Sequence, residues 1–143
     1  MSPPPAGSSQ DHSSHLKLGY VYISVRNTDA AVQYYREVLG AKLLWRIQKF
    51  GALVAALQTQ ASDPILLLND HHSPPRAEPV FIVDSAVVMH ARLEQRRARS
   101  LSAPTGAATG MMATFEDLDG NPLAIVDHSA IQTFQRVVEE QNK

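Results

Sequence analysis

The same order of predicted elements, strand–helix–strand–strand–strand, occurs twice along this chain, and this internal repeat restricts the possible folds more than any other feature. In the first copy, polar and apolar residues alternate from Lys17, as in a strand with one apolar face. Asn27 is a candidate N-cap for the following helix, and Gly40 supplies the left-handed residue that ends it. Three short strands are then predicted over residues 42–49, 52–58 and 65–69.

The second copy follows a proline-containing linker over residues 71–77. It begins with a strand over residues 80–83, continues with a helix capped by Asp84 or Ser85, and ends with strands over 111–116 and 123–127, which leaves one strand of the repeat without assigned residues. A last amphipathic helix is too short to be stable alone, so it should dock on its own sheet or on a second subunit. The predicted organisation is therefore a disordered leader (1–16), a domain (17–128) with module one (17–70), the linker and module two (78–128), and a C-terminal amphipathic helix (129–143).

The composition indicates one compact soluble domain, because 44% of the 143 residues are hydrophobic and 19% are charged. A net charge of −1 gives no general attraction to nucleic acid or to an anionic membrane. The chain has no cysteine, which excludes disulfides, thiolate metal sites and a cysteine nucleophile. No apolar run is long enough to span a bilayer, and we expect a cytoplasmic protein that binds neither membrane nor nucleic acid. Four arginines are interpreted as the solvated face of the second helix: Arg92, Arg96, Arg97 and Arg99.

Three segments carry a resemblance to a known family: residues 20–27 (YVYISVRN), 34–40 (YYREVLG) and 117–123 (DLDGNPL). They are similar to the first strand, the helix end and the Asp-Pro-Asp-Gly-Asn turn of the vicinal oxygen chelate superfamily. That superfamily includes glyoxalase I, the extradiol dioxygenases, and the bleomycin and fosfomycin resistance proteins. The resemblance implies an α+β fold in which two βαβββ modules form a cup-shaped mixed sheet, and it also implies a homodimer.

The resemblance also implies where a divalent metal would be held in family members that use one. The four positions map to Tyr20, Leu66, Glu78 and Ala124, and both pairs of equivalent positions, 20 with 78 and 66 with 124, are 58 residues apart. A catalytic zinc site typically needs three protein ligands, whereas these positions offer a phenol, an isobutyl group, one carboxylate and a methyl group. We therefore predict a site without metal and a protein without a cofactor.

The predicted ligand-binding residues on the concave face are Tyr20, Tyr22, Trp45, Glu78 and Ala124. The register of the second strand is open, so either Trp45 and Ile47 or Arg46 and Gln48 face the cup. Apolar walls with a few polar anchors are typical of small-molecule sites. Glu78 is a candidate lone general base. Both tyrosines could instead be packed core residues with satisfied hydroxyls.

Three functions remain as alternatives at this point. The first is a metal-free protein that binds a small organic molecule, similar to a resistance protein that sequesters a drug. The second is a glyoxalase-like lyase or isomerase, or an extradiol-type dioxygenase, that holds zinc, nickel, iron or manganese through displaced ligands such as His71, His72 or Glu116. The third is a structural or regulatory subunit. His90 is interpreted as a boundary residue of its helix, and His128 as the end of a strand near solvent.

Overall fold

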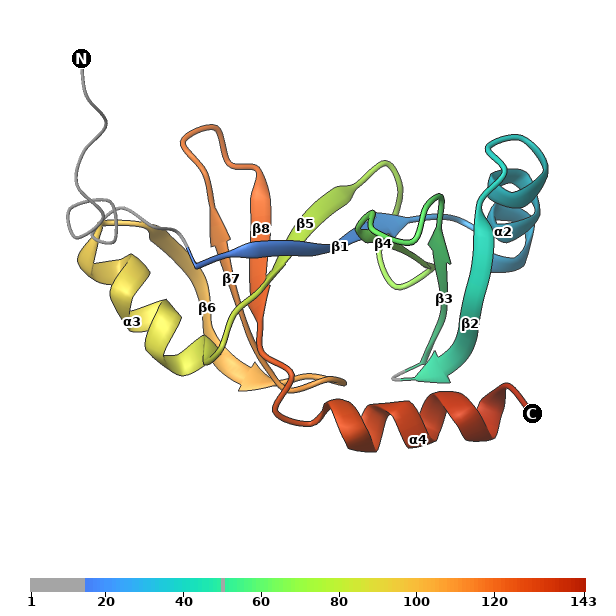
Figure 1. Ribbon diagram of the computed structural model, residues 1–143. Helices are drawn as coiled ribbons and strands as arrows, with labels where there is room; N and C mark the ends of the chain where they lie inside the picture. Colours follow the sequence, from blue (N-terminus) through green and yellow to red (C-terminus); the bar gives the residue numbers. More distant parts are fainter. Residues whose placement is uncertain (1–14, 50) are drawn as a thin grey trace, which may run out of the picture.

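The computed structural model describes residues 15–49 and 51–143, and these residues form one eight-stranded sheet and three helices (Figure 1). Most of the predicted leader, residues 1–14, lies outside the described residues. The elements, in chain order, are β1 (Lys17–Ser24), α2 (Thr28–Glu37), β2 (Lys42–Lys49), β3 (Ala52–Gln58), β4 (Ile65–Asn69), β5 (Ala77–Ile82), α3 (Ala86–Gln95), β6 (Arg99–Gly106), β7 (Met111–Glu116), β8 (Pro122–Val126) and α4 (Ile131–Gln141).

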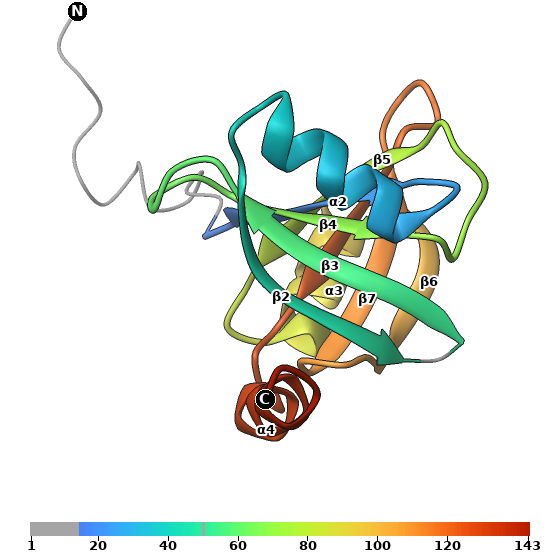
Figure 2. The ribbon, with the colours of Figure 1, turned by 90° about the vertical axis from the view of Figure 1, so that its right-hand side faces the viewer.

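The sheet order is β2-β3-β4-β1-β5-β8-β7-β6, so each βαβββ unit supplies one half of a mixed sheet. The two halves meet at the antiparallel pair β1 and β5, and each of these strands runs parallel to the last strand of its own unit, β4 or β8. The sheet curls around a concave face, and α4 lies across the open side (Figures 1 and 2). The predicted α+β cup built from two βαβββ units is confirmed.

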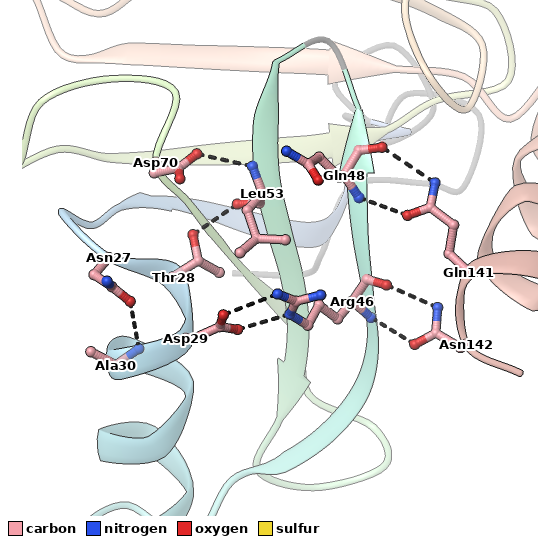
Figure 3. Close-up of polar contacts among 10 residues, drawn as sticks. All are labelled: Asn27, Thr28, Asp29, Ala30, Arg46, Gln48, Leu53, Asp70, Gln141 and Asn142. Atoms are coloured by element: carbon pink, nitrogen blue, oxygen red, sulfur yellow. Dashed lines mark hydrogen bonds and ion pairs between the residues drawn. The ribbon is translucent and has the colours of Figure 1, made fainter.

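The starts of α2 and α3 follow the predicted capping pattern. The Asn27 side-chain oxygen accepts a hydrogen bond from Ala30 N at 2.9 Å (Figure 3), and Ser85 Oγ accepts one from Val88 N at 3.2 Å. Ser85 rather than Asp84 is therefore the cap of α3. Within the described part of the chain, no helix has the length and apolar character needed to cross a bilayer.

Strand β6 carries no sequence signal that predicts it. The interpretation of Arg96, Arg97 and Arg99 as residues of the second helix is wrong, since Arg96 is the C-cap and Arg97 has a positive φ of 68°. The helix ends at Gln95, and Arg99 opens β6, where its guanidinium pairs with the Glu116 carboxylate of β7 at 3.1 Å. The strand is mostly exposed, contains Pro104, and its pairing with β7 shifts register twice. An exposed and irregular edge strand has no apolar alternation, so its pattern resembles that of a loop.

The two faces of the sheet bury different apolar clusters. On the convex face, α2 packs over Ala55, Leu57 and Leu68, while α3 packs over the cluster that contains Ala113, Phe115 and Ile125. Residues that alternate with these along the same strands point to the concave face, among them Val54, Ala56, Leu67, Ala124 and Val126. The two convex helices thus leave the concave face available for a site.

The C-terminal helix docks on its own sheet, which is one of the two outcomes expected from the sequence. Its apolar side chains Ile131, Phe134 and Val138 pack against the concave cluster of β2, β3 and β4. The ring of Phe134 meets that of Trp45 edge to face, with centroids 5.3 Å apart. α4 therefore forms one wall of the space inside the curled sheet.

Two amides at the end of this helix bond the outer edge of β2 (Figure 3). Arg46 N donates to Asn142 Oδ1 at 3.0 Å and Asn142 Nδ2 donates to Arg46 O at 2.9 Å. Gln48 N donates to Gln141 Oε1 at 2.8 Å, and Gln141 Nε2 donates to Gln48 O at 3.3 Å. Each carboxamide thus occupies the donor and acceptor positions that a neighbouring strand would fill.

Replacing Gln141 and Asn142 together by alanine should loosen this end of α4 without unfolding the protein. Exposed hydrogen bonds each contribute about 0.5–1.5 kcal/mol, so we expect a loss of about 1–2 kcal/mol because partial solvation compensates. Amide hydrogen exchange should accelerate at Arg46 and Gln48, whose N–H groups lose their acceptors. The matched control replaces the exposed Gln132 and Gln135 of the same helix by alanine. Unchanged protection of both amides in the first variant would contradict the prediction.

Asp127 connects four segments at the end of β8. Its Oδ2 accepts from Ala86 N at 2.9 Å, and its Oδ1 accepts from Met111 N at 2.9 Å, from Ser129 N at 3.2 Å and from Ser129 Oγ at 2.7 Å. The residue is only 4% exposed. Burial by itself raises the pKa of Asp127, but the hydrogen bonds from Ala86, Ser129 and Met111 outweigh burial and hold its pKa below the ordinary 3.8. This carboxylate therefore ties α3, β7 and the start of α4 to β8.

Candidate functional site

A cavity of about 240 Å³ lies between the concave face of the sheet and α4. Strands from both modules, His71 in the segment after β4, the loop between β6 and β7, and α4 all contribute to its wall. The lining residues are Tyr20, Tyr22, Trp45, Ile47, Lys49, Ala52, Val54, Leu67, His71, Val80, Ala107, Ala108, Thr109, Met112, Val126 and Phe134. Such a wall, apolar and aromatic with a few polar groups, is typical of small-molecule sites, and the cavity volume lies just below their usual range of about 300–1,000 Å³.

The two tyrosines of β1 both face this cavity. Burial raises the pKa of Tyr20. Burial also raises the pKa of Tyr22, and the nearby Glu78 carboxylate adds a smaller effect in the same direction. Both phenols therefore stay protonated near neutral pH. The Tyr20 hydroxyl lies 3.0 Å from His128 Nε2. Burial lowers the pKa of His128, and the neighbouring Asp127 carboxylate opposes this with a smaller effect. His128 therefore does more than end a strand, because it hydrogen-bonds a cavity residue.

The register of β2 resolves the alternative left open by the sequence. Pairing with β3 shifts between Leu43 and Trp45, and beyond this irregularity Trp45, Ile47 and Lys49 line the cavity. Arg46 faces the other way, where its guanidinium forms a bidentate pair with the Asp29 carboxylate of α2 at 2.8 and 3.0 Å (Figure 3). An extra residue in one strand re-aims every side chain that follows it.

Two predicted ligand-binding residues, Glu78 and Ala124, belong to the concave face without lining the cavity. Glu78 is buried, and its carboxylate accepts a hydrogen bond from the Arg76 guanidinium at 3.2 Å. Ala124 is fully buried and packs with Val80 and Val126. Contact of either residue with a ligand stays a prediction, as does the role of Glu78 as a base.

The mapping of Leu66 to the concave face is wrong. Leu66 pairs with Val21 and Leu57, whose side chains point to the convex face, whereas Leu67 pairs with Tyr22 and lines the cavity. Tyr22 pairs with Leu67 just as Val80 pairs with Ala124. Equivalent positions of the two modules are thus 58 residues apart in their first strands (22 and 80), but 57 residues apart in their last strands (67 and 124). A slip of one residue moves a side chain to the other face.

The corrected set of four positions does not fit a divalent metal. Tyr20 is a protonated phenol bonded to His128, Leu67 and Ala124 carry no donor atom, and Glu78 is bonded to Arg76. Typical catalytic zinc sites use three protein ligands. Among residues 15–49 and 51–143, no three His, Asp or Glu side chains lie close enough together to hold an ion.

The displaced ligands of the second alternative are not brought together either. His71 and His72 are neighbours with ring centroids 4.5 Å apart, and only His71 lines the cavity. Glu116 instead pairs with Arg99 at the β6–β7 edge of the sheet. His90 is buried against Phe115 and lies 2.9 Å from Ser100 Oγ through Nε2, which is a packing role on the convex side.

The sequence interpretation misses several contributors to the cavity wall, among them Phe134, Lys49 and the loop residues 107–109. The spacing of Ile131, Phe134 and Val138 indicates a buried helix face but not the surface that it covers. Lys49 could have been found by extending the alternation from Trp45 once the β2 register was known. The small residues of the loop carry no signal of their own.

Comparison with known proteins agrees with this architecture. The model of the Glyoxalase/Bleomycin resistance protein/Dioxygenase superfamily matches residues 17–125, so the chain belongs to that superfamily. No curated protein matches the sequence. Among solved structures, the chain is similar to methylmalonyl-CoA epimerase from Mycobacterium tuberculosis, with a TM-score of 0.66 at 20% identity over 82% of this chain and 91% of that chain.

Two further structures show the same likeness. A hypothetical protein from Bacillus halodurans C-125 has a TM-score of 0.66 at 16% identity, covering 78% of this chain and 94% of that chain. A methylmalonyl-CoA epimerase in complex with methylmalonyl-CoA and NH4+ has a TM-score of 0.64 at 18% identity, covering 81% and 96%. At these identities the similarity establishes the fold, and function must be argued from the site.

Proposed function

We propose that this protein binds a small, largely apolar organic molecule in the cavity between the concave face and α4, without a metal ion, and that it sequesters a drug or metabolite. The observation that carries the proposal is the aromatic and aliphatic wall, in which Tyr20, Tyr22, Trp45 and Phe134 provide flat surfaces for a ring. The wall combines side chains from both modules with one from α4. A ligand would therefore be enclosed by elements that are far apart in the sequence.

Metal independence is supported by the chemistry of the four family positions. A phenol, an isobutyl group, a carboxylate already paired with Arg76 and a methyl group do not form a ligand set. Binding energy must then come from apolar burial and from the few polar groups of the wall. The second alternative, a metal-dependent lyase, isomerase or dioxygenase, would need a ligand set that these four positions do not supply.

Trp45 makes the proposal directly testable, because it is the single tryptophan of the chain and it lines the cavity. Titration with ring compounds, beginning with neutral ones such as benzamide and cyclohexanecarboxamide, should change its fluorescence and raise the melting temperature. Replacing Ala108 by phenylalanine should fill the cavity and weaken binding by at least about tenfold, which corresponds to 1.4 kcal/mol. Ala103→Phe, on the exposed face of β6, is the matched control and should bind as the unaltered protein does.

Two results would contradict the proposal. The first is that no compound of a broad library of small ring compounds produces a saturable change in Trp45 fluorescence or in thermal stability. The second is that protein purified without a tag retains one equivalent of zinc, nickel, iron or manganese and loses ligand binding when a chelator removes this metal. Chromatography of the bound compound should recover it unchanged after incubation.

The homodimer and the cytoplasmic location implied at the sequence level also stay predictions. For the dimer, the end of α2 and the two residues after it offer an exposed apolar surface, with Tyr34, Val38 and Leu39 being 56%, 60% and 53% exposed. Sedimentation at micromolar concentration distinguishes a dimer from a monomer.

A further inference from the structure

The helix that covers the cavity lies outside the residues that match the superfamily. The match ends at residue 125, and α4 begins at Ile131. Figure 1 shows α4 running across the open side of the curled sheet. Its contribution to the lining of the cavity is the side chain of Phe134. The size of the site is therefore set in part by an element beyond the matched residues.

Contacts at both ends hold α4 against the sheet. Before its first turn, Asp127 Oδ1 accepts hydrogen bonds from the amide and the hydroxyl of Ser129. After its last turn, Asn142 exchanges two hydrogen bonds with Arg46 of the β2 edge. Between these contacts, Phe134 is only 8% exposed. A helix that is fixed at both ends gives this buried ring little freedom to move aside for a ligand.

The apolar neighbours of Phe134 restrict its ring further. The centroid of the ring lies 5.3 Å from that of Trp45 in an edge-to-face arrangement. Val54, Ala56 and Leu67 of the sheet belong to the same cluster. The ring can leave its position only by giving up these contacts. Phe134 is therefore a firm boundary of the cavity on the side of α4.

The volume of the cavity corresponds to a small ligand. An apolar cavity of about 150 Å³ holds one benzene molecule, which is about 25 Å³ for each non-hydrogen atom. On this scale the cavity of about 240 Å³ has room for about nine or ten non-hydrogen atoms, which is one six-membered ring with a small substituent. Two fused rings with the same substituent need roughly 325 Å³.

We propose that Phe134 sets the size of ligand that this cavity accepts and restricts it to compounds with a single six-membered ring. This inference rests on the proposed function and narrows it to one ligand class. The phenyl group of Phe134 is itself one such ring, so its removal adds about 150 Å³ on the same scale before the wall relaxes. The enlarged site should then accept a second fused ring.

The test compares benzamide with 2-naphthamide, two neutral compounds that differ by one fused ring. Calorimetric titration of the full chain should show benzamide binding at least about tenfold tighter than 2-naphthamide. The sign of this preference is informative, because a site without a size limit binds the larger apolar compound more tightly through the greater area that it buries. Neutral probes also keep the charged groups near the cavity out of the comparison.

Two variants assign the size limit to Phe134. Phe134→Ala should reverse the preference, so that 2-naphthamide binds more tightly than benzamide. Phe134→Leu keeps an apolar side chain at this position and should reduce the preference severalfold, so it carries the test if the alanine variant does not fold. Val138→Ala is the matched control, since Val138 packs in the same cluster from the same helix but is not a lining residue. It should keep the preference of the unaltered protein.

The outcomes separate the two proposals. Equal binding of the two compounds by the unaltered protein, or tighter binding of 2-naphthamide, overturns the size limit and leaves the proposed function standing. A benzamide preference that is unchanged in the folded Phe134 variants, or that Val138→Ala also reverses, overturns the assignment to this residue. Absence of binding by both compounds, together with a silent library, overturns the proposed function and the size limit with it.

Discussion

Replacing Gly110 by alanine should destabilise the protein by about 3 kcal/mol or more, because the added methyl group has no space and its neighbours cannot move away cheaply. A Cβ at this position would overlap the backbone oxygen and the carboxylate of Asp127 and would lie 2.8 Å from Ser129 N. Gly110 itself is buried. Any shift that relieves the overlap breaks hydrogen bonds of the buried Asp127 carboxylate.

Denaturant unfolding monitored by Trp45 fluorescence measures this effect. Gly106→Ala is the matched control, since Gly106 lies at the other end of the same loop and a Cβ there meets nothing within 4 Å. That variant should change stability by less than about 0.5 kcal/mol. Similar stabilities for the two variants would show that the close approach of Gly110 to Asp127 does not constrain the fold.

Asp127→Asn should cost about 2–3 kcal/mol, although the new side chain has nearly the same shape. The carboxylate accepts four hydrogen bonds, from Ala86 N, Met111 N, Ser129 N and Ser129 Oγ. A carboxamide has one acceptor oxygen, so its NH₂ group must face one of these donors. If it faces Ala86 N, the start of α3 loses its tie to β8. Asp84→Asn, exposed beside the same helix start, is the control.

The same carboxylate gives a stability that depends on pH. Because the folded-state pKa of Asp127 lies below the ordinary 3.8, its contribution is complete above that value and is lost as pH falls through the folded pKa. Thermal unfolding of the unaltered protein should therefore weaken progressively below about pH 4, while the asparagine variant should show a shallower decline. Parallel pH profiles for the two proteins would contradict the prediction.

The strands that could be predicted are those with a strong apolar pattern. Residues 42–49, 52–58, 65–69 and 111–116 are strands both in the sequence interpretation and in the structure, because each packs at least one face in a core cluster. Strand β6 has neither face well buried and lies at the sheet edge, so nothing in its composition distinguishes it from a loop. Only the assembled sheet shows which strand lies at the edge, so the sequence alone could not predict β6.

The error at Leu66 has a different physical origin. Counting equal offsets along the chain assumes that both modules have the same length between their first and last strands. The structure shows that they differ by one residue, and in a strand one residue exchanges the two faces. The prediction of a poor ligand set survives the correction, because Leu67 offers no more donor atoms than Leu66.

The candidate site was predictable on the side of the sheet and not on the side of α4. Tyr20 and Tyr22 follow from strand alternation and from the repeat, and Trp45 was one of two alternatives for its strand; all three line the cavity. Phe134 could be assigned to a buried helix face, but its contact with Trp45 depends on the direction in which the chain turns after His128. That direction is set by Asp127 and Ser129 acting together, a tertiary contact without a local pattern.

The amides of Gln141 and Asn142 have a consequence for how separate molecules of this protein meet. By imitating a ninth strand along β2, they hide backbone groups that could otherwise recruit the edge of another copy. A variant without residues 141–143 would keep the packing of Phe134 against the sheet, and with it the fold. It would, however, expose the unpaired backbone groups of the β2 edge to other molecules. We therefore expect Gln141 and Asn142 to oppose association through the β2 edge, although they contribute little to the core.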